Sequence, residues 1–195
     1  ILSENACLVG RGTIIHSYPH SWRSKAPLIF RTTPQWFISM NENDLRKKSL
    51  KSISETNFFP PQGAKRLSSM IKSRPDWCIS RQRAWGVPIG IFYNKKTLEP
   101  LKDKDVLDKV IKSFKDYGAD AWYKFDASFF LGEKYNTEDY IKVTDIADVW
   151  FDSGSTHTYV LEDRNDLKWP ASLYLEGTDQ HRGWFHSSLL ESCGT

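Results

Sequence analysis

Hydrophobic and polar positions follow helical spacing in three parts of the chain. The clearest helix is predicted over residues 105–117, with Asp105 able to cap its start and Gly118 closing its end. Its apolar positions share one face: Val106, Val110, Ile111 and Phe114. A second helix is predicted from Pro61, ending at Pro75, with the stripe Leu67, Met70 and Ile71. A third begins at Trp184, with the stripe Trp184, Phe185, Leu189 and Leu190.

Short apolar runs between turn residues predict strands instead of helices. They are residues 6–9, 13–15, 28–30, 87–93, 146–151 and 173–175. Pro88 and Gly90 weaken the run 87–93, so we expect it at the edge of a sheet. Strands that alternate with helices indicate an α/β fold.

The segment after residues 173–175 carries the most polar chemistry in the chain. Its polar side chains are Glu176, Asp179, Gln180, His181 and Arg182, and Gly177 and Gly183 would let a ligand approach the backbone. A polar turn between a strand and a helix is where α/β sheets bind ligands. The alternative is a plain turn in which Thr178 or Asp179 caps the following helix.

Composition indicates a folded protein without a strong charge bias. The chain has 195 residues, of which 39% are hydrophobic and 26% charged, and its formal net charge is +3. It is long enough for one domain or one and a half. The small basic excess permits contact with nucleic acid but does not argue for it.

The cysteines and the absence of apolar spans suggest a cytoplasmic location. Cys7, Cys78 and Cys193 are far apart and odd in number, which favours reduced thiols. No run is long enough to cross a bilayer, and no signal peptide is visible, so no membrane partner is expected. The chain opens on Ile1, which suggests a piece of a longer protein.

Four ordered segments resemble isoleucyl-tRNA synthetases, which are class I aminoacyl-tRNA synthetases. They are residues 16–23 together with 30–37, then 74–89, 148–154 and 174–185. The resemblance implies a partial Rossmann-type catalytic domain with a small β-rich junction segment. Residues 1–40 would end the editing-domain insertion, and residues 41–195 would form the connective and catalytic part. The leucyl and valyl enzymes of the same class carry different residues at 177–184, so those alternatives are disfavoured.

The resemblance also implies the reaction and its participants. Enzymes of this family join isoleucine to ATP, with Mg²⁺, and then transfer the acyl group to tRNA(Ile). The protein contributes positioning and charge stabilisation and no nucleophile, so no catalytic residue is assigned. Early and late signature motifs of the family are missing here, and we expect these residues alone to be inactive without the remaining parts of the same synthetase chain. A stand-alone module that binds tRNA or adenylate is the alternative from a different functional class.

Carried over by position, the resemblance assigns two groups of binding residues. The aminoacyl-adenylate would be held by Glu176, Gly177, Asp179 and Gln180. The isoleucine side chain would lie between two indole rings, those of Trp150 and Trp184.

Two further segments leave less definite expectations. Arg81 and Arg83 could contact phosphate or the tRNA backbone, or could instead stack on Trp77 and Trp85 and fix the loop. Some relatives bind zinc through cysteines beside the position of Trp22, but this chain has serines there, so no metal is expected.

Overall fold

The computed structural model describes all residues, 1–195, in two units, Ile1–Pro34 and Gln35–Thr195. The predicted boundary at residue 40 separates the end of an editing-domain insertion from the connective and catalytic part. It stays a prediction. No helix of the chain combines the length and the apolar character that crossing a membrane requires.

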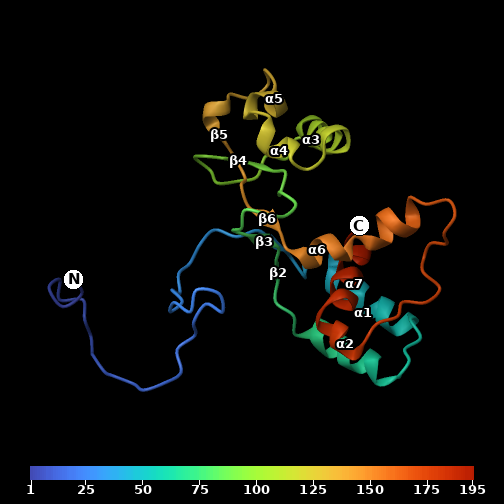
Figure 1. Cartoon of the computed structure of the whole chain (residues 1–195), viewed down its shortest axis with the longest axis horizontal. Coiled ribbons are helices and arrows are strands. Elements are labelled where there is room, and N and C mark those ends of the chain that lie inside the picture. Colours follow the sequence, from blue (N-terminus) through green and yellow to red (C-terminus); the bar gives the residue numbers. More distant parts are fainter. The chain divides into compact units, whose positions relative to one another are not determined.

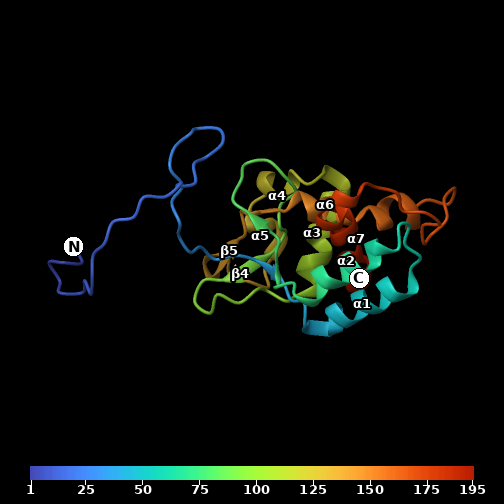
Figure 2. The ribbon, with the colours of Figure 1, turned by 90° about the horizontal axis from the view of Figure 1, so that it is seen from below.

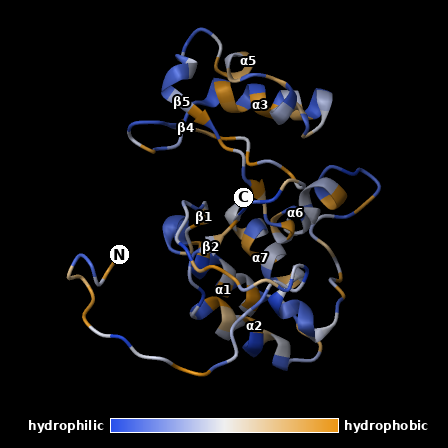
Figure 3. Cartoon of the chain, turned by 60° about the vertical axis from the view of Figure 1, so that its left-hand side comes forward, coloured by the Kyte–Doolittle hydropathy of each residue, from blue (hydrophilic) through white to orange (hydrophobic).

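The first unit is almost entirely irregular. One isolated bridge joins His20 to Pro27, and the Tyr18 hydroxyl donates to the carbonyl of Leu28 at 2.7 Å. The strands predicted over 6–9, 13–15 and 28–30 are wrong. Their hydrophobic residues lie along an exposed coil (Figure 3). A strand needs a neighbouring strand to receive its backbone hydrogen bonds, and no segment of this unit supplies one.

The second unit contains one helical bundle and one smaller lobe. The bundle consists of α1 (Leu45–Glu55), α2 (Gln62–Lys72), α6 (Val149–Gly154) and α7 (Trp184–Gly194). Figures 1 and 2 both show these helices side by side. The smaller lobe holds α3 (Lys104–Tyr117), α4 (Ala121–Lys124) and α5 (Ala127–Leu131) beside β4 (Phe92–Asn94) and β5 (Tyr140–Lys142).

Every strand pair in the chain is antiparallel and short. β1 (Phe37–Ile38) pairs with β2 (Trp77–Cys78), β3 (Ser80–Arg81) with β6 (Ile146–Ala147), and β4 with β5. The fold is therefore mixed and mostly helical, with two-stranded sheets. The α/β expectation holds only in that both kinds of element are present.

Apolar periodicity predicted three of the seven α-helices. The helices expected from Pro61, over 105–117 and from Trp184 are confirmed as α2, α3 and α7. The cap of α3 lies two residues earlier than expected: Asp103, not Asp105, accepts a hydrogen bond from the backbone N–H of Val106 at 3.1 Å. The pattern did not reveal α1, because buried Ser49 interrupts its stripe of Leu45 and Ile53.

Three predicted strands in this unit need correction. Residues 87–93 form strand only from Phe92, and residues 146–151 form strand only at Ile146–Ala147 before helix α6 begins. Helix α6 starts there because the Asp148 carboxylate caps it, accepting from the N–H of Trp150 at 3.3 Å. Residues 173–175 are coil, and Leu173 and Leu175 are more than two-thirds exposed. No strand lies beside them to pair with.

Separate hydrophobic clusters stabilise the bundle and the lobe. In the bundle, side chains of α1, α2 and α7 surround Trp77; the fully or nearly buried members are Met40, Leu45, Ile53, Leu67, Ile71 and Leu190. In the lobe, Trp122 is 1% exposed and packs edge-on against Phe92, with ring centroids 5.0 Å apart. Its indole N–H donates to the Val143 carbonyl at 2.7 Å, so this buried donor is satisfied.

Candidate functional site

The polar segment before α7 folds into a 3₁₀ helix, η4 (Thr178–Arg182). Buried His181 anchors it, because its Nδ1 contacts the Thr178 carbonyl at 2.7 Å and its ring meets Phe185 edge-on. Gly63 of α2 permits this approach: a Cβ there would lie 3.0 Å from Nε2 of His181. Neither Thr178 nor Asp179 caps a helix with its side chain, so the plain-turn alternative lacks its expected cap.

Gln180 links η4 to the start of α7. Its Oε1 accepts from the backbone N–H of Trp184 at 2.9 Å, and its amide donates to Asp179 at 3.1 Å. Gly177 begins η4 in extended conformation, and a Cβ there would lie 2.7 Å from Oδ1 of Asp179. Glu176 is exposed and has no side-chain hydrogen bond or ion pair. The structure thus fixes Gln180 and leaves the carboxylate of Glu176 facing solvent.

The two tryptophans assigned to the isoleucine pocket lie on neighbouring helices. The Trp184 indole N–H donates to the Ser153 carbonyl of α6 at 2.9 Å, and its ring stacks on Tyr174 with centroids 4.2 Å apart. Gly183 lies against the ring of Trp150, where a Cβ would come within 2.9 Å of Cη2. A side chain at position 183 would therefore displace one of the two indole-bearing segments.

Arg81 does not stack on a tryptophan. Its guanidinium forms an ion pair with Asp148 at 2.7 Å and donates to the carbonyls of Cys78 and Ser80. This pair joins β3 to the residue that caps α6. Arg83 is exposed and has neither a hydrogen bond nor an ion pair. The arginine that lies over Trp77 is Arg74, with its guanidinium carbon 5.6 Å from the ring centroid. This contact was not identified from the sequence.

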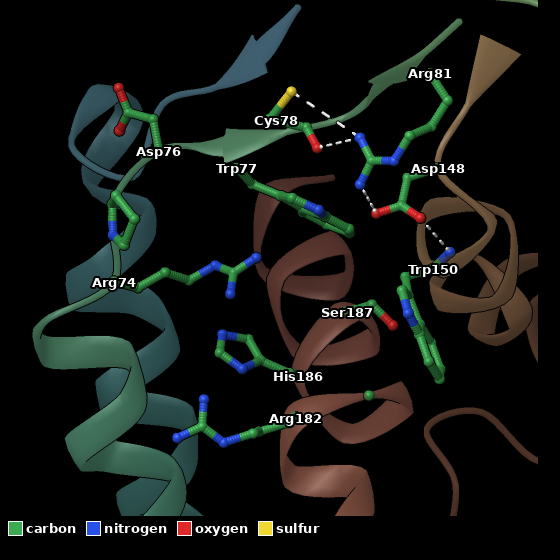
Figure 4. A pocket seen from close by; sticks show the side chains of 12 residues that line it. Arg74, Asp76, Trp77, Cys78, Arg81, Asp148, Trp150, Arg182, His186 and Ser187 are labelled. Carbon is green, nitrogen blue, oxygen red and sulfur yellow. Dashed lines mark hydrogen bonds and ion pairs between the residues drawn. The ribbon is translucent and has the colours of Figure 1, made fainter. Parts of the chain in front are cut away.

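A cavity of about 320 Å³ lies between the segment that follows α2, β2, the start of α6 and the start of α7 (Figure 4). Of the predicted site residues, Arg81 and Trp150 line it, whereas Glu176, Asp179, Gln180, Trp184 and Arg83 do not. The other polar lining side chains are Arg74, Asp76, Cys78, Asp148, Arg182, His186 and Ser187. The predicted residues therefore fall in two adjacent places, the cavity and the η4 turn.

Two buried groups on α7 have strongly displaced pKa values. Burial, with a smaller effect of Asp152, raises the pKa of Glu191 to about 8. Burial, followed by the charge of Arg74, lowers the pKa of His186 to about 4. Neither residue was identified from the sequence. The available signal was the presence of His186 and Glu191 inside an otherwise apolar and small-residue helix.

No group of three or more His, Cys, Asp or Glu side chains is arranged to hold a metal ion. The three cysteines are free thiols.

Comparison with known proteins defines the class. Residues 16–195 match the family described as tRNA synthetases class I (I, L, M and V), so the chain belongs to this family. Within it, the chain is similar to isoleucine–tRNA ligases. The ligase of Pelagibacter ubique (strain HTCC1062) is 58% identical over 194 residues, covering 100% of this chain and 21% of the relative. That of Gluconobacter oxydans (strain 621H) is 60% identical over 189 residues, covering 96% and 20%.

The resemblance inferred from the four sequence segments is confirmed by these matches. A third relative, the isoleucine–tRNA ligase of Bartonella henselae, is 59% identical over 194 residues. The chain spans about a fifth of the length of these relatives.

Proposed function

We propose that this chain is part of an isoleucine–tRNA ligase and supplies the aminoacyl side of its adenylation site. The proposed reaction joins isoleucine to ATP, with Mg²⁺, and passes the acyl group to tRNA(Ile). Identities of 58–60% to isoleucine–tRNA ligases over nearly the whole chain support this proposal. The three free thiols are compatible with a reducing, cytoplasmic compartment.

One structural observation carries the proposal. Gln180, Trp184 and α6 are connected by the hydrogen bonds at the N–H and the indole of Trp184. These bonds hold one amide side chain beside two indole-bearing helices. A branched alkyl group needs flat, rigid walls for dispersion contact, and an amide can hydrogen-bond an ammonium or a hydroxyl without adding charge.

In the proposed reaction the isoleucine carboxylate attacks the α-phosphorus of ATP, and pyrophosphate leaves. The chain's residues orient the amino acid through Trp150 and Trp184. Glu176, whose exposed carboxylate has no partner within the chain, is available to accept hydrogen bonds from a ribose or an ammonium. Gly177 and Asp179 would adjoin the nucleotide, and Arg81 and Arg83 would contact phosphate or tRNA backbone.

We also propose that residues 41–195 form part of a Rossmann-type domain and residues 1–40 the return from an editing module. Leu173 and Leu175 are exposed in an irregular segment, where a strand outside these residues could pair with the backbone. The relatives, about five times as long, have chain enough to supply that strand.

The test is isoleucine-dependent ATP–pyrophosphate exchange by the complete protein that contains these residues. We expect exchange with isoleucine well above that with leucine, and none from residues 1–195 alone when host enzyme is removed. Exchange that responds to leucine or valine in preference to isoleucine would refute the assignment. Isoleucine-dependent exchange by residues 1–195 alone would refute their proposed dependence on the remaining chain.

A further inference from the structure

The corner of the cavity formed by Arg74, Arg182 and His186 has an excess of positive charge. Figure 4 shows the imidazole of His186 between the two guanidinium groups. Neither arginine forms an ion pair. The nearby carboxylate of Asp148 is bonded to Arg81, and Asp76 accepts from the backbone of Met40 at 2.9 Å.

The adjoining hollow has no acidic residue at all. It has a volume of about 280 Å³ and is lined by Met70, Ser73, Arg74, Pro75, Arg182 and His186. The same two arginines and histidine therefore border both hollows. Two positive charges side by side without a carboxylate between them are unfavourable unless an anion or solvent separates them.

Two buried nitrogen atoms at this corner lack hydrogen-bond partners. They are Nε of Arg74 and Nε2 of His186, and the His186 residue is only 6% exposed. Buried polar atoms are normally paired, so an unpaired set that borders a cavity indicates a missing partner. An oxyanion would accept from Nε of Arg74, and from Nε2 of His186 once that nitrogen is protonated.

The position of this corner is fixed by other side chains. Arg46 of α1 donates to the carbonyls of Ile71 and Arg74 at 2.6 and 2.9 Å, which holds the end of α2 and the backbone of Arg74. His186 is oriented through Nδ1, which lies 3.2 Å from the His181 carbonyl. The backbone of Arg74 and the ring of His186 are thus positioned before any ligand binds, which lowers the entropy lost on binding.

We propose that Arg74, Arg182 and His186 bind one phosphate group of a substrate. A phosphate presents several acceptor oxygens, which matches guanidinium groups on two sides and an imidazole between them. That the phosphate belongs to ATP or to tRNA rests on the proposed function. The anion site itself follows from the geometry and stands without it.

Binding at this site takes up a proton on His186. Its Nδ1 donates to a carbonyl, so in the neutral ring Nε2 has only a lone pair and cannot donate to an anion. The charged groups facing the ring are Arg74, from the segment after α2, and Arg182, from η4; both disfavour the imidazolium. A bound anion offsets them, so its affinity increases as pH falls.

Sulfate is a suitable probe, because its charge does not change between pH 5.5 and 8. We would titrate the complete protein with sodium sulfate by calorimetry at constant ionic strength. Arg182→Gln should weaken binding about fivefold, as expected for one exposed charge pair. Arg66→Gln, an exposed arginine of α2 outside the cavity, is the matched control and should bind as the unaltered protein does.

Histidine variants separate direct binding from a general effect of charge. His186→Asn keeps a donor near Nδ1 but removes Nε2, so it should abolish the tighter binding at pH 5.5 relative to pH 8. His186→Gln places an amide near Nε2 and should retain binding with no dependence on pH. Equal sulfate affinity in Arg182→Gln, His186→Asn and the unaltered protein, with the same pH dependence, would overturn the proposal.

Kinetics of the same variants identify the source of the phosphate. An increase in the KM for ATP alone in Arg182→Gln, absent from Arg66→Gln, assigns the site to the nucleotide; an increase in the KM for tRNA alone assigns it to the polynucleotide. If the protein has no ligase activity while sulfate binding still depends on Arg182, the proposed function fails and the anion site stands.

Discussion

Replacing Glu191 with Gln should change how the stability of helix α7 depends on pH. Glu191 is 7% exposed, and its Oε1 has no hydrogen-bond partner. The carboxyl lies against Gly154 of α6, where a Cβ would be 2.7 Å from Cδ of Glu191. The carboxyl therefore leaves no room for a side chain at position 154, and its burial favours the neutral carboxylic acid.

The size of the effect follows from linkage between protonation and folding. The pKa of Glu191 is raised from 4.5 to about 8, so between these values the folded state holds a proton that the unfolded state has released. Stability is then lost as pH rises, by about 1.4 kcal/mol per pH unit. From pH 5 to pH 7, wild type should lose about 2–3 kcal/mol more than Glu191→Gln, which cannot ionise.

Hydrogen–deuterium exchange of the peptide spanning α7, corrected for intrinsic rates at each pH, measures this local opening free energy. Glu162→Gln, which alters an exposed carboxylate at the end of the π-helix His157–Glu162, is the matched control and should follow wild type. His186, with its lowered pKa, contributes a change of opposite sign in every variant and cancels from the comparison. Parallel curves for wild type and Glu191→Gln between pH 5 and pH 7 would refute the reasoning.

Three further substitutions test other parts of the structure. Gly154→Ala should destabilise the contact between α6 and α7 by about 1–3 kcal/mol, because its Cβ would lie 3.0 Å from the backbone carbonyl carbon of Ser187. Hydrogen–deuterium exchange of the α6 and α7 amides measures this loss, and unchanged protection would contradict the prediction. Trp122→Ala should lower the opening free energy of the α3–α5 lobe by about 3–5 kcal/mol in the same assay, whereas Trp85→Ala, at a residue 91% exposed, should lower it little. Equal effects would contradict the role of Trp122 in the core of the lobe. Arg81→Gln should destabilise the start of α6, because it leaves Asp148 without its cationic partner. The midpoint of chemical unfolding should then be lower than that of the control Arg83→Gln, and equal midpoints would contradict the prediction.

Helices α2, α3 and α7 were accessible from the sequence because their information is local. In α3, Val106 and Val110 recur at helical spacing, and both are buried in the lobe. Strands were not accessible in the same way. Leu173 and Leu175 have strand-like composition, but a strand exists only when another segment pairs with it, and the sequence pattern does not say whether one does.

From the sequence, the candidate site could be predicted only within the segments that resemble the family. The turn, Trp150 and Arg81 stood in recognisable segments. Arg74 also stood in one, but neither it nor His186 was identified as a site residue, because their significance lies in being brought to one cavity by the segment after α2 and by α7. Glu191 was likewise invisible as a titrating group, since its displaced pKa depends on burial against a different helix.

The central claim is that Trp184 and α6 form one wall of a pocket for an isoleucyl adenylate. The most direct test is calorimetric binding of isoleucyl-sulfamoyl adenosine, an unreactive adenylate analogue, to the complete protein. Trp184→Ala should weaken binding about tenfold or more, while Trp184→Phe, which keeps a flat ring, and Trp85→Ala retain most of the affinity. Equal affinity of Trp184→Ala and Trp85→Ala for the analogue would contradict the account.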